Sequence, residues 1–77
     1  MNEVKPYKVG VIKSIFRDSA SGELRGVLET INDDDNDLEL PFVITNPLLI
    51  DIKQGKMVKF VKERGTVISR AVDVDKL

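Results

Sequence analysis

The feature that most constrains the fold is the alternation of apolar and polar side chains along residues 56–63, directly after a glycine turn. Such alternation is typical of a β-strand with one buried face, because successive side chains point to opposite sides of a strand. A second turn at residues 64–65 leads into another strand at residues 66–74. The pattern predicts a C-terminal β-hairpin. It also predicts that Phe60 is a core residue, because Phe60 shares a face with Val58.

Three further strands are predicted before this hairpin, at residues 7–16, 24–31 and 38–45. All three are rich in β-branched residues, which suit a half-buried pleated surface. Gly26 lies inside the second of them and predicts a sharp bend. Pro41 lies inside the third and indicates that part of this strand is at a sheet edge or beside a bulge, since proline has no N–H to donate.

One short helical turn is predicted between the third and fourth strands, at residues 46–52. Asn46 is a suitable N-cap, and Pro47 suits the first helical position. Five short strands and one helical crossover predict an all-β fold, a small five-stranded Greek-key barrel of the OB-fold type. An SH3-like barrel has similar strands and is the structural alternative. The 77 residues are expected to form a single domain, residues 1–77, with its core within residues 7–75.

The composition removes several classes of chemistry. The chain has no cysteine and no histidine, which excludes disulfides, thiolate or imidazole metal sites, and Ser-His-Asp catalysis. We therefore expect neither enzymatic activity nor a cofactor. No apolar run approaches the length of a membrane span, and the N-terminus does not resemble a signal peptide. These observations predict a soluble cytoplasmic domain without a membrane partner.

The net charge of −1 is unevenly distributed along the chain. One predicted loop holds four aspartates: Asp33, Asp34, Asp35 and Asp37. Asp33, Asp35 and Asp37 have the spacing of the first three ligands of an EF-hand loop, but Leu38 replaces the required glycine and Ile44 replaces the bidentate glutamate. A solvated acidic loop without a metal is therefore expected. Outside this loop, basic side chains outnumber acidic ones, which leaves room for a basic face.

The order of these segments resembles the cold-shock domain family of OB-fold barrels. The similar segments are residues 10–15 (GVIKSI), 24–28 (LRGVL) and 41–45 (PFVIT), together with a C-terminal part that runs from Gly55 to Val74. They stand where the family has Gly-x-Val-Lys-Trp-Phe, Lys-Gly-Phe-Gly-Phe-Ile and Val-Phe-Val-His-Phe, and an ending with Gly-Gln-x-Val-x-Phe and Ala-x-x-Val. The resemblance covers nearly the whole chain and implies an OB-fold.

Most of the aromatic rings on which the family stacks bases are replaced in this chain. Ser14 stands at the tryptophan position, and Ile15 stands at the next phenylalanine position unless Phe16 takes its place through a one-residue bulge. Arg25 and Val27 replace two further phenylalanines. Because each stacked base contributes roughly 1–3 kcal/mol, these replacements predict weak binding with low sequence specificity.

The resemblance implies a partner, single-stranded RNA or DNA, and a set of binding residues. Phe42 is retained and is expected to stack on a base. Lys13 and Lys59 are expected to contact phosphates, and Arg25 to stack on a base or pair with a phosphate. The alternative function is a protein-interaction or dimerisation module that has lost nucleic-acid binding, since aliphatic replacements such as Val27 suit a protein partner better than a base.

Overall fold

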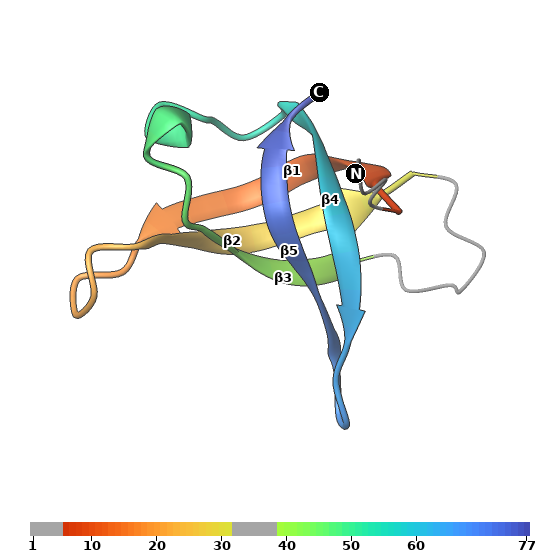
Figure 1. Ribbon diagram of the computed structural model, residues 1–77. Helices are drawn as coiled ribbons and strands as arrows, with labels where there is room; N and C mark the ends of the chain where they lie inside the picture. Colours follow the sequence, from red (N-terminus) through yellow and green to blue (C-terminus); the bar gives the residue numbers. More distant parts are fainter. Residues whose placement is uncertain (1–5, 32–38) are drawn as a thin grey trace, which may run out of the picture.

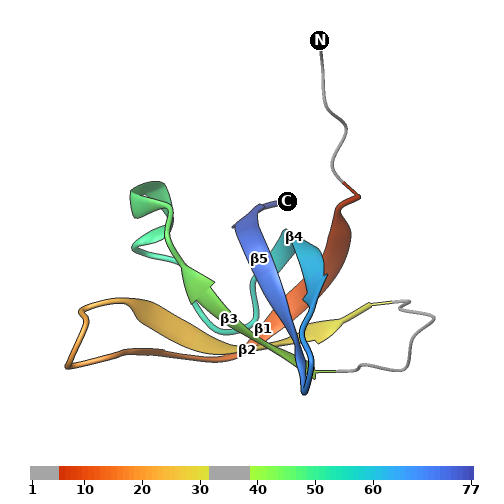
Figure 2. The same ribbon diagram turned by 60° about the horizontal axis from the view of Figure 1, so that its bottom comes forward.

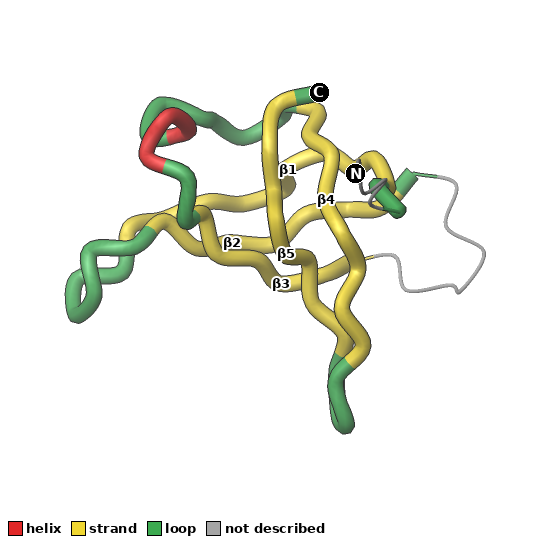
Figure 3. Tube along the Cα trace, viewed as in Figure 1, coloured by secondary structure: helices red, strands yellow, loops and turns green. Residues whose placement is uncertain are grey.

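The computed structural model describes residues 6–31 and 39–77, which form five strands and one short 3-10 helix (Figure 1). The elements in chain order are β1 (Lys8–Arg17), β2 (Leu24–Thr30), β3 (Glu39–Ile44), the helix η1 (Pro47–Leu49), β4 (Met57–Arg64) and β5 (Ser69–Lys76). Every predicted strand is present, with its ends displaced by a few residues. Figure 3 shows that strands make up nearly all of the barrel wall.

The five strands form a closed barrel in the order β1-β2-β3-β5-β4. All neighbouring pairs are antiparallel except β3 and β5, which are parallel and meet at Phe42 and Ala71. β1 closes the barrel because its first part, from Lys8 to Val11, pairs with β4 while nearly its whole length pairs with β2. The fold is thus an all-β, OB-fold-like small barrel, the first of the two architectures that the sequence allows.

The core fills the barrel with aliphatic side chains and two aromatic rings. Phe60 and Val58 are fully buried, which confirms the prediction from strand alternation. The core cluster consists of Ile12, Leu28, Leu40, Phe42, Ile44, Leu49, Val58, Phe60, Ala71 and Val74. These residues come from all five strands and from η1, so the barrel buries one continuous apolar interior.

A β-bulge in β1 changes which of its side chains face the core. The register between β1 and β2 shifts between Ile12 and Ser14. Before the bulge Ile12 points inward, and after it Ile15 packs against the core. Gly26 accommodates this distortion, because a Cβ atom on Gly26 would lie 2.0 Å from the carbonyl oxygen of Ser14. The bend predicted at Gly26 thus coincides with a position where only glycine fits.

The segment between β3 and β4 confirms the predicted helical turn. Pro47 opens η1, and the Oδ1 atom of Asn46 accepts a hydrogen bond of 3.0 Å from the backbone N–H of Leu48. Pro41 lies in β3 opposite Val27 of β2, and β3 meets β5 only at its neighbour Phe42. Pro41 is therefore not on an edge strand, since β3 lies between β2 and β5 in the closed barrel, but it stands where the pairing with β5 is limited to one residue.

Two parts of the sheet project from the barrel. Figure 2 shows the β1–β2 turn projecting to one side of the barrel and the β4–β5 hairpin extending in another direction. Among residues 6–31 and 39–77, no helix is long and apolar enough to cross a membrane.

Candidate interaction face

The outer side of β1, β2 and β3 carries two rows of side chains in register. One row contains Ser14, Val27 and Pro41, and the next contains Phe16, Arg25 and Val43. Side chains two residues apart on a strand share a face, so the two rows form one continuous surface. We call it the outer patch; its residues are Ser14, Phe16, Arg25, Val27, Pro41 and Val43.

The structure corrects the role expected for Phe42. Only 3% of this residue is exposed, and its ring belongs to the core cluster. Phe42 lies opposite Gly26 in the register, on the inner side of the sheet, so neither of its ring faces is available to a nucleic-acid base. The strand alternation had left the orientation of this side chain open, and the closed barrel directs it inward.

Phe16 occupies the outer patch instead. The bulge after Ile12 shifts the alternation of β1 by one residue, which turns the Phe16 ring to the outside and leaves 58% of the residue exposed. Ile15 then packs on the core side. From the sequence, we considered this outward position of Phe16 as the consequence of a one-residue bulge. Phe16 is thus the exposed aromatic residue of the three-stranded sheet.

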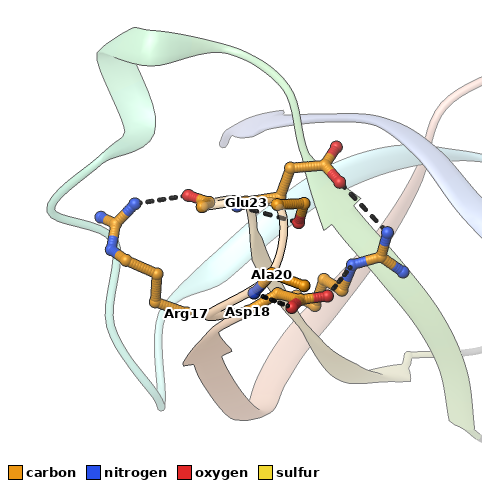
Figure 4. A network of polar contacts seen from close by, with 7 residues as sticks. Arg17, Asp18, Ala20 and Glu23 are labelled. Atoms are coloured by element: carbon orange, nitrogen blue, oxygen red, sulfur yellow. Dashed lines mark hydrogen bonds and ion pairs between the residues drawn. The ribbon is translucent and has the colours of Figure 1, made fainter.

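Arg25 lies in the middle of the outer patch and is held by two carboxylates, those of Asp18 and Glu23. Figure 4 shows these two acidic residues at the β1–β2 turn. The Nε atom of Arg25 lies 3.3 Å from Oδ2 of Asp18, and its Nη2 atom donates a 3.1 Å hydrogen bond to Oε1 of Glu23. The Nε atom is buried and its contact with Asp18 is an ion pair without hydrogen-bond geometry. Both carboxylates flank the β1–β2 turn. The charge that was expected to meet a phosphate is therefore already compensated.

Lys13 is compensated in the same way on the other side of the patch. Its Nζ atom donates a 2.8 Å hydrogen bond to Oε2 of Glu39 and lies 3.5 Å from Oε2 of Glu29. This ion-pair cluster links β1, β2 and β3 across the outer surface. The hydrogen bond to Glu39 and the negative charges of Glu39 and Glu29 raise the pKa of Lys13 above its usual value of 10.5.

Lys59 lies apart from the other three expected binding residues. It pairs in register with Val9 of β1 and Asp75 of β5, on the outside of β4. Its Nζ atom lies 4.7 Å from the centre of the Tyr7 ring, a cation–π contact. The structure thus places Arg25 in the outer patch and Lys13 at its border. It places Phe42 beneath the sheet, and Lys59 on another part of the barrel.

The charge around the outer patch is negative rather than positive. Two cations, Lys13 and Arg25, are outnumbered by four carboxylates, those of Asp18, Glu23, Glu29 and Glu39. From the sequence, we considered the cations but not these acidic partners. Two of the partners could have been found by aligning β2 and β3 as a hairpin, because Glu29 and Glu39 then lie directly opposite each other.

The comparisons with known proteins identify no family, since no family model, curated protein or solved structure matches this chain.

The aspartates considered for calcium lie at residues 33–37, outside the described residues. Within the described ranges, no three acidic side chains are grouped so as to hold a metal ion. We therefore take the outer patch as the candidate site. It is a largely apolar surface with the ion-paired Arg25 in its middle and the ion pairs of Lys13 at its border.

Proposed function

We propose that this barrel is a protein-interaction module and that its outer patch is the contact surface. The observation that carries the proposal is the state of the two cations on this face, since Lys13 and Arg25 each already contact two carboxylates. A phosphate backbone arriving here would meet a surface with more negative than positive charges. Electrostatic attraction supplies most of the affinity of non-specific nucleic-acid binders, and here that contribution is missing.

The remaining features of the patch suit a protein partner. Phe16, Val27, Pro41 and Val43 provide aromatic and aliphatic surface around Arg25, and the ion pairs of Lys13 lie at the border of this surface. Protein interfaces commonly combine an apolar centre, enriched in aromatic residues and arginine, with a polar rim. Phe16 is more than half exposed in the free protein, so covering its ring removes apolar area from water. The ring is therefore the expected main contact.

A second candidate function is weak binding of single-stranded nucleic acid. It is supported by the register of Phe16 beside Arg25, which pairs an exposed ring with a guanidinium on the face that the cold-shock resemblance assigns to binding. The stacking role expected for Phe42 then passes to Phe16. Lys13 and Lys59 keep their expected roles as phosphate contacts, provided that the phosphate displaces the carboxylates around Lys13.

Site-specific photo-crosslinking in cells tests the proposal against this second candidate. A benzoyl-phenylalanine is introduced at position 16, in the outer patch, or at position 67, which is 94% exposed at the tip of the β4–β5 hairpin. The proposal predicts a discrete, protease-sensitive adduct from position 16 that is absent from position 67. The same adduct should be lost when Val43→Asp is added, because a carboxylate buried within the contact surface opposes an apolar contact.

Two outcomes would overturn the proposal. An adduct at position 16 that is removed by nuclease and not by protease would favour the nucleic-acid function. Equal protein adducts at positions 16 and 67 would show that the patch has no preference over any exposed apolar site. The folded state of each variant is checked by its amide NMR spectrum before the cells are irradiated.

A further inference from the structure

The second half of β1 has a free edge. β4 pairs with β1 from Lys8 to Val11, and residues around Gly55 make the next backbone contacts, with Ile12. From Ser14 to Arg17, the structure gives β1 only β2 as a neighbouring strand among the described residues. An unpaired strand edge presents backbone N–H and C=O groups to any extended chain that approaches it. The edge is four residues long and begins directly after the bulge.

The two sides of this edge differ in chemistry. Ser14 and Phe16 lie on the outer side, where Phe16 is the exposed ring of the outer patch. Ile15 and Arg17 lie on the inner side, in register with Gly26 and Leu24 of β2. Arg17 also lines an open cleft of about 330 Å³, whose apolar lining includes Leu24, Ile44 and Ile50. A strand added at this edge would therefore meet the exposed Phe16 ring on the outer side and the Arg17 guanidinium, with the cleft that it lines, on the inner side.

Arg17, which Figure 4 shows at the β1–β2 turn, differs from Arg25 in its partners. The Nη1 atom of Arg17 donates a 2.6 Å hydrogen bond to the carbonyl oxygen of Gly22. Within the part of the chain that the structure describes, no carboxylate pairs with the Arg17 guanidinium, whereas Asp18 and Glu23 both pair with Arg25. The positive charge of Arg17 on the cleft lining thus has no carboxylate partner among the described residues and is available for a carboxylate ligand.

We propose that the Ser14–Arg17 edge of β1 binds an extended peptide in which aliphatic and acidic residues alternate. The peptide would add to the sheet as a strand, a common mode of peptide recognition. Because successive side chains of a strand point to opposite faces, its aliphatic residues would cover Phe16 while its acidic residues reach Arg17. The proposal rests on the proposed function and names the kind of partner segment that the outer patch recognises.

The test uses the full chain and a synthetic peptide, acetyl-Thr-Val-Glu-Val-Glu-Val-Thr-amide, followed by amide NMR shifts. The proposal predicts saturable shifts at residues 14–17 and around the cleft. A matched peptide with glutamine in place of both glutamates should bind about tenfold more weakly, because a charge-assisted hydrogen bond is lost. The variant Arg17→Gln should lose the same factor. The control Arg70→Gln should lose nothing, since Arg70 lies on β5 and pairs with Glu63.

Two N-methylated forms of the peptide test strand addition itself. Only every second N–H of the peptide points to the strand edge. N-methylation of the residues whose N–H groups point to β1 should therefore abolish the shifts. N-methylation of the residues in between should leave the shifts nearly unchanged. Equal binding of both forms would overturn strand pairing. Shifts that do not include residues 14–17, or that are insensitive to Arg17→Gln, would overturn the assigned site.

Other outcomes distinguish this inference from the proposed function. If the peptide causes no shifts while position 16 still gives a protein adduct in cells, the peptide chemistry is wrong and the proposed function remains. If the peptide binds at residues 14–17 but position 16 gives no protein adduct, the outer patch does not bind a protein in cells. The proposed function is then wrong, and so is the inference that this edge recognises a segment of a protein partner. Signals of residues 14–17 that shift with protein concentration alone would show a second copy on the edge, which also overturns the inference.

Discussion

The inner and outer sides of the β1–β2–β3 sheet each hold a phenylalanine, and the two have opposite roles. Phe42 points inward and is 3% exposed, whereas Phe16 points outward and is 58% exposed. The resemblance drawn from the sequence led us to expect Phe42 as the stacking ring, whereas Phe16 stood one residue beyond an aromatic position of that pattern. The bulge between Ile12 and Ser14 accounts for the position of Phe16. A shift of one residue in a strand therefore decides which ring a partner can reach.

The two arginines at the β1–β2 turn show a related difference in charge. Arg25 lies on the outer side with two carboxylate partners, and Arg17 lies on the inner side with a backbone carbonyl as its partner. Of these two arginines, Arg17 is the one without a carboxylate partner among the described residues. A count of basic residues along the sequence treats the two alike, although their ability to bind an anion differs.

The largest expected effect separates the two phenylalanines. We expect Phe42→Ala to destabilise the fold by about 3–5 kcal/mol, the usual cost of truncating a buried phenylalanine. That is enough to unfold much of so small a domain. We expect Phe16→Ala to change stability by about 0.5 kcal/mol or less, as at other exposed positions. Urea unfolding followed by circular dichroism measures both. Similar losses for the two variants would contradict the assignment of Phe42 to the core and Phe16 to the surface.

A smaller effect tests the bulge that separates them. Gly26→Ala places a methyl group against the carbonyl oxygen of Ser14, and we expect a loss of about 3 kcal/mol from this overpacking. Gly22→Ala is the matched control, since its φ of 77° is strained for alanine but no atom lies within 4 Å of the added Cβ. The control should cost about 1 kcal/mol. The same urea experiment applies, and a harmless Gly26→Ala would mean that the bulge is absent in solution.

The smallest effect concerns the ion pairs on the outer side. The pKa of Lys13 is raised by its hydrogen bond to Glu39 and by the charges of Glu39 and Glu29. The folded state therefore holds this proton more tightly than the unfolded chain does. The stabilising contribution is fully present below about pH 10.5 and disappears as the pH rises through the higher pKa of the folded state. The difference in melting temperature between the wild type and Lys13→Met should shrink over that range. A constant difference would argue against the ion pair.

Much of the fold was predictable from local sequence patterns. Strand alternation identified all five strands and the burial of Phe60, and the side-chain chemistry of Asn46 and Pro47 identified the helical turn. The orientation of Phe16 and Phe42 was not predictable in the same way, because it depends on a bulge that Gly26 permits but does not require. A hairpin alignment of β2 and β3 could have placed Glu29 opposite Glu39, but their contact with Lys13 was not predictable, because Lys13 lies at the bulge of β1.

The central claim is that the outer patch is not a phosphate-binding surface, because its cations are already paired. The most direct test is an amide NMR titration with a short pyrimidine-rich single-stranded DNA, first at low salt and then at physiological salt. Low salt favours any binding to phosphate. The account predicts no shifts at Lys13, Phe16 or Arg25 even at low salt. Shifts at these residues that fade as salt is added would contradict it and would establish the outer patch as a single-strand binding site.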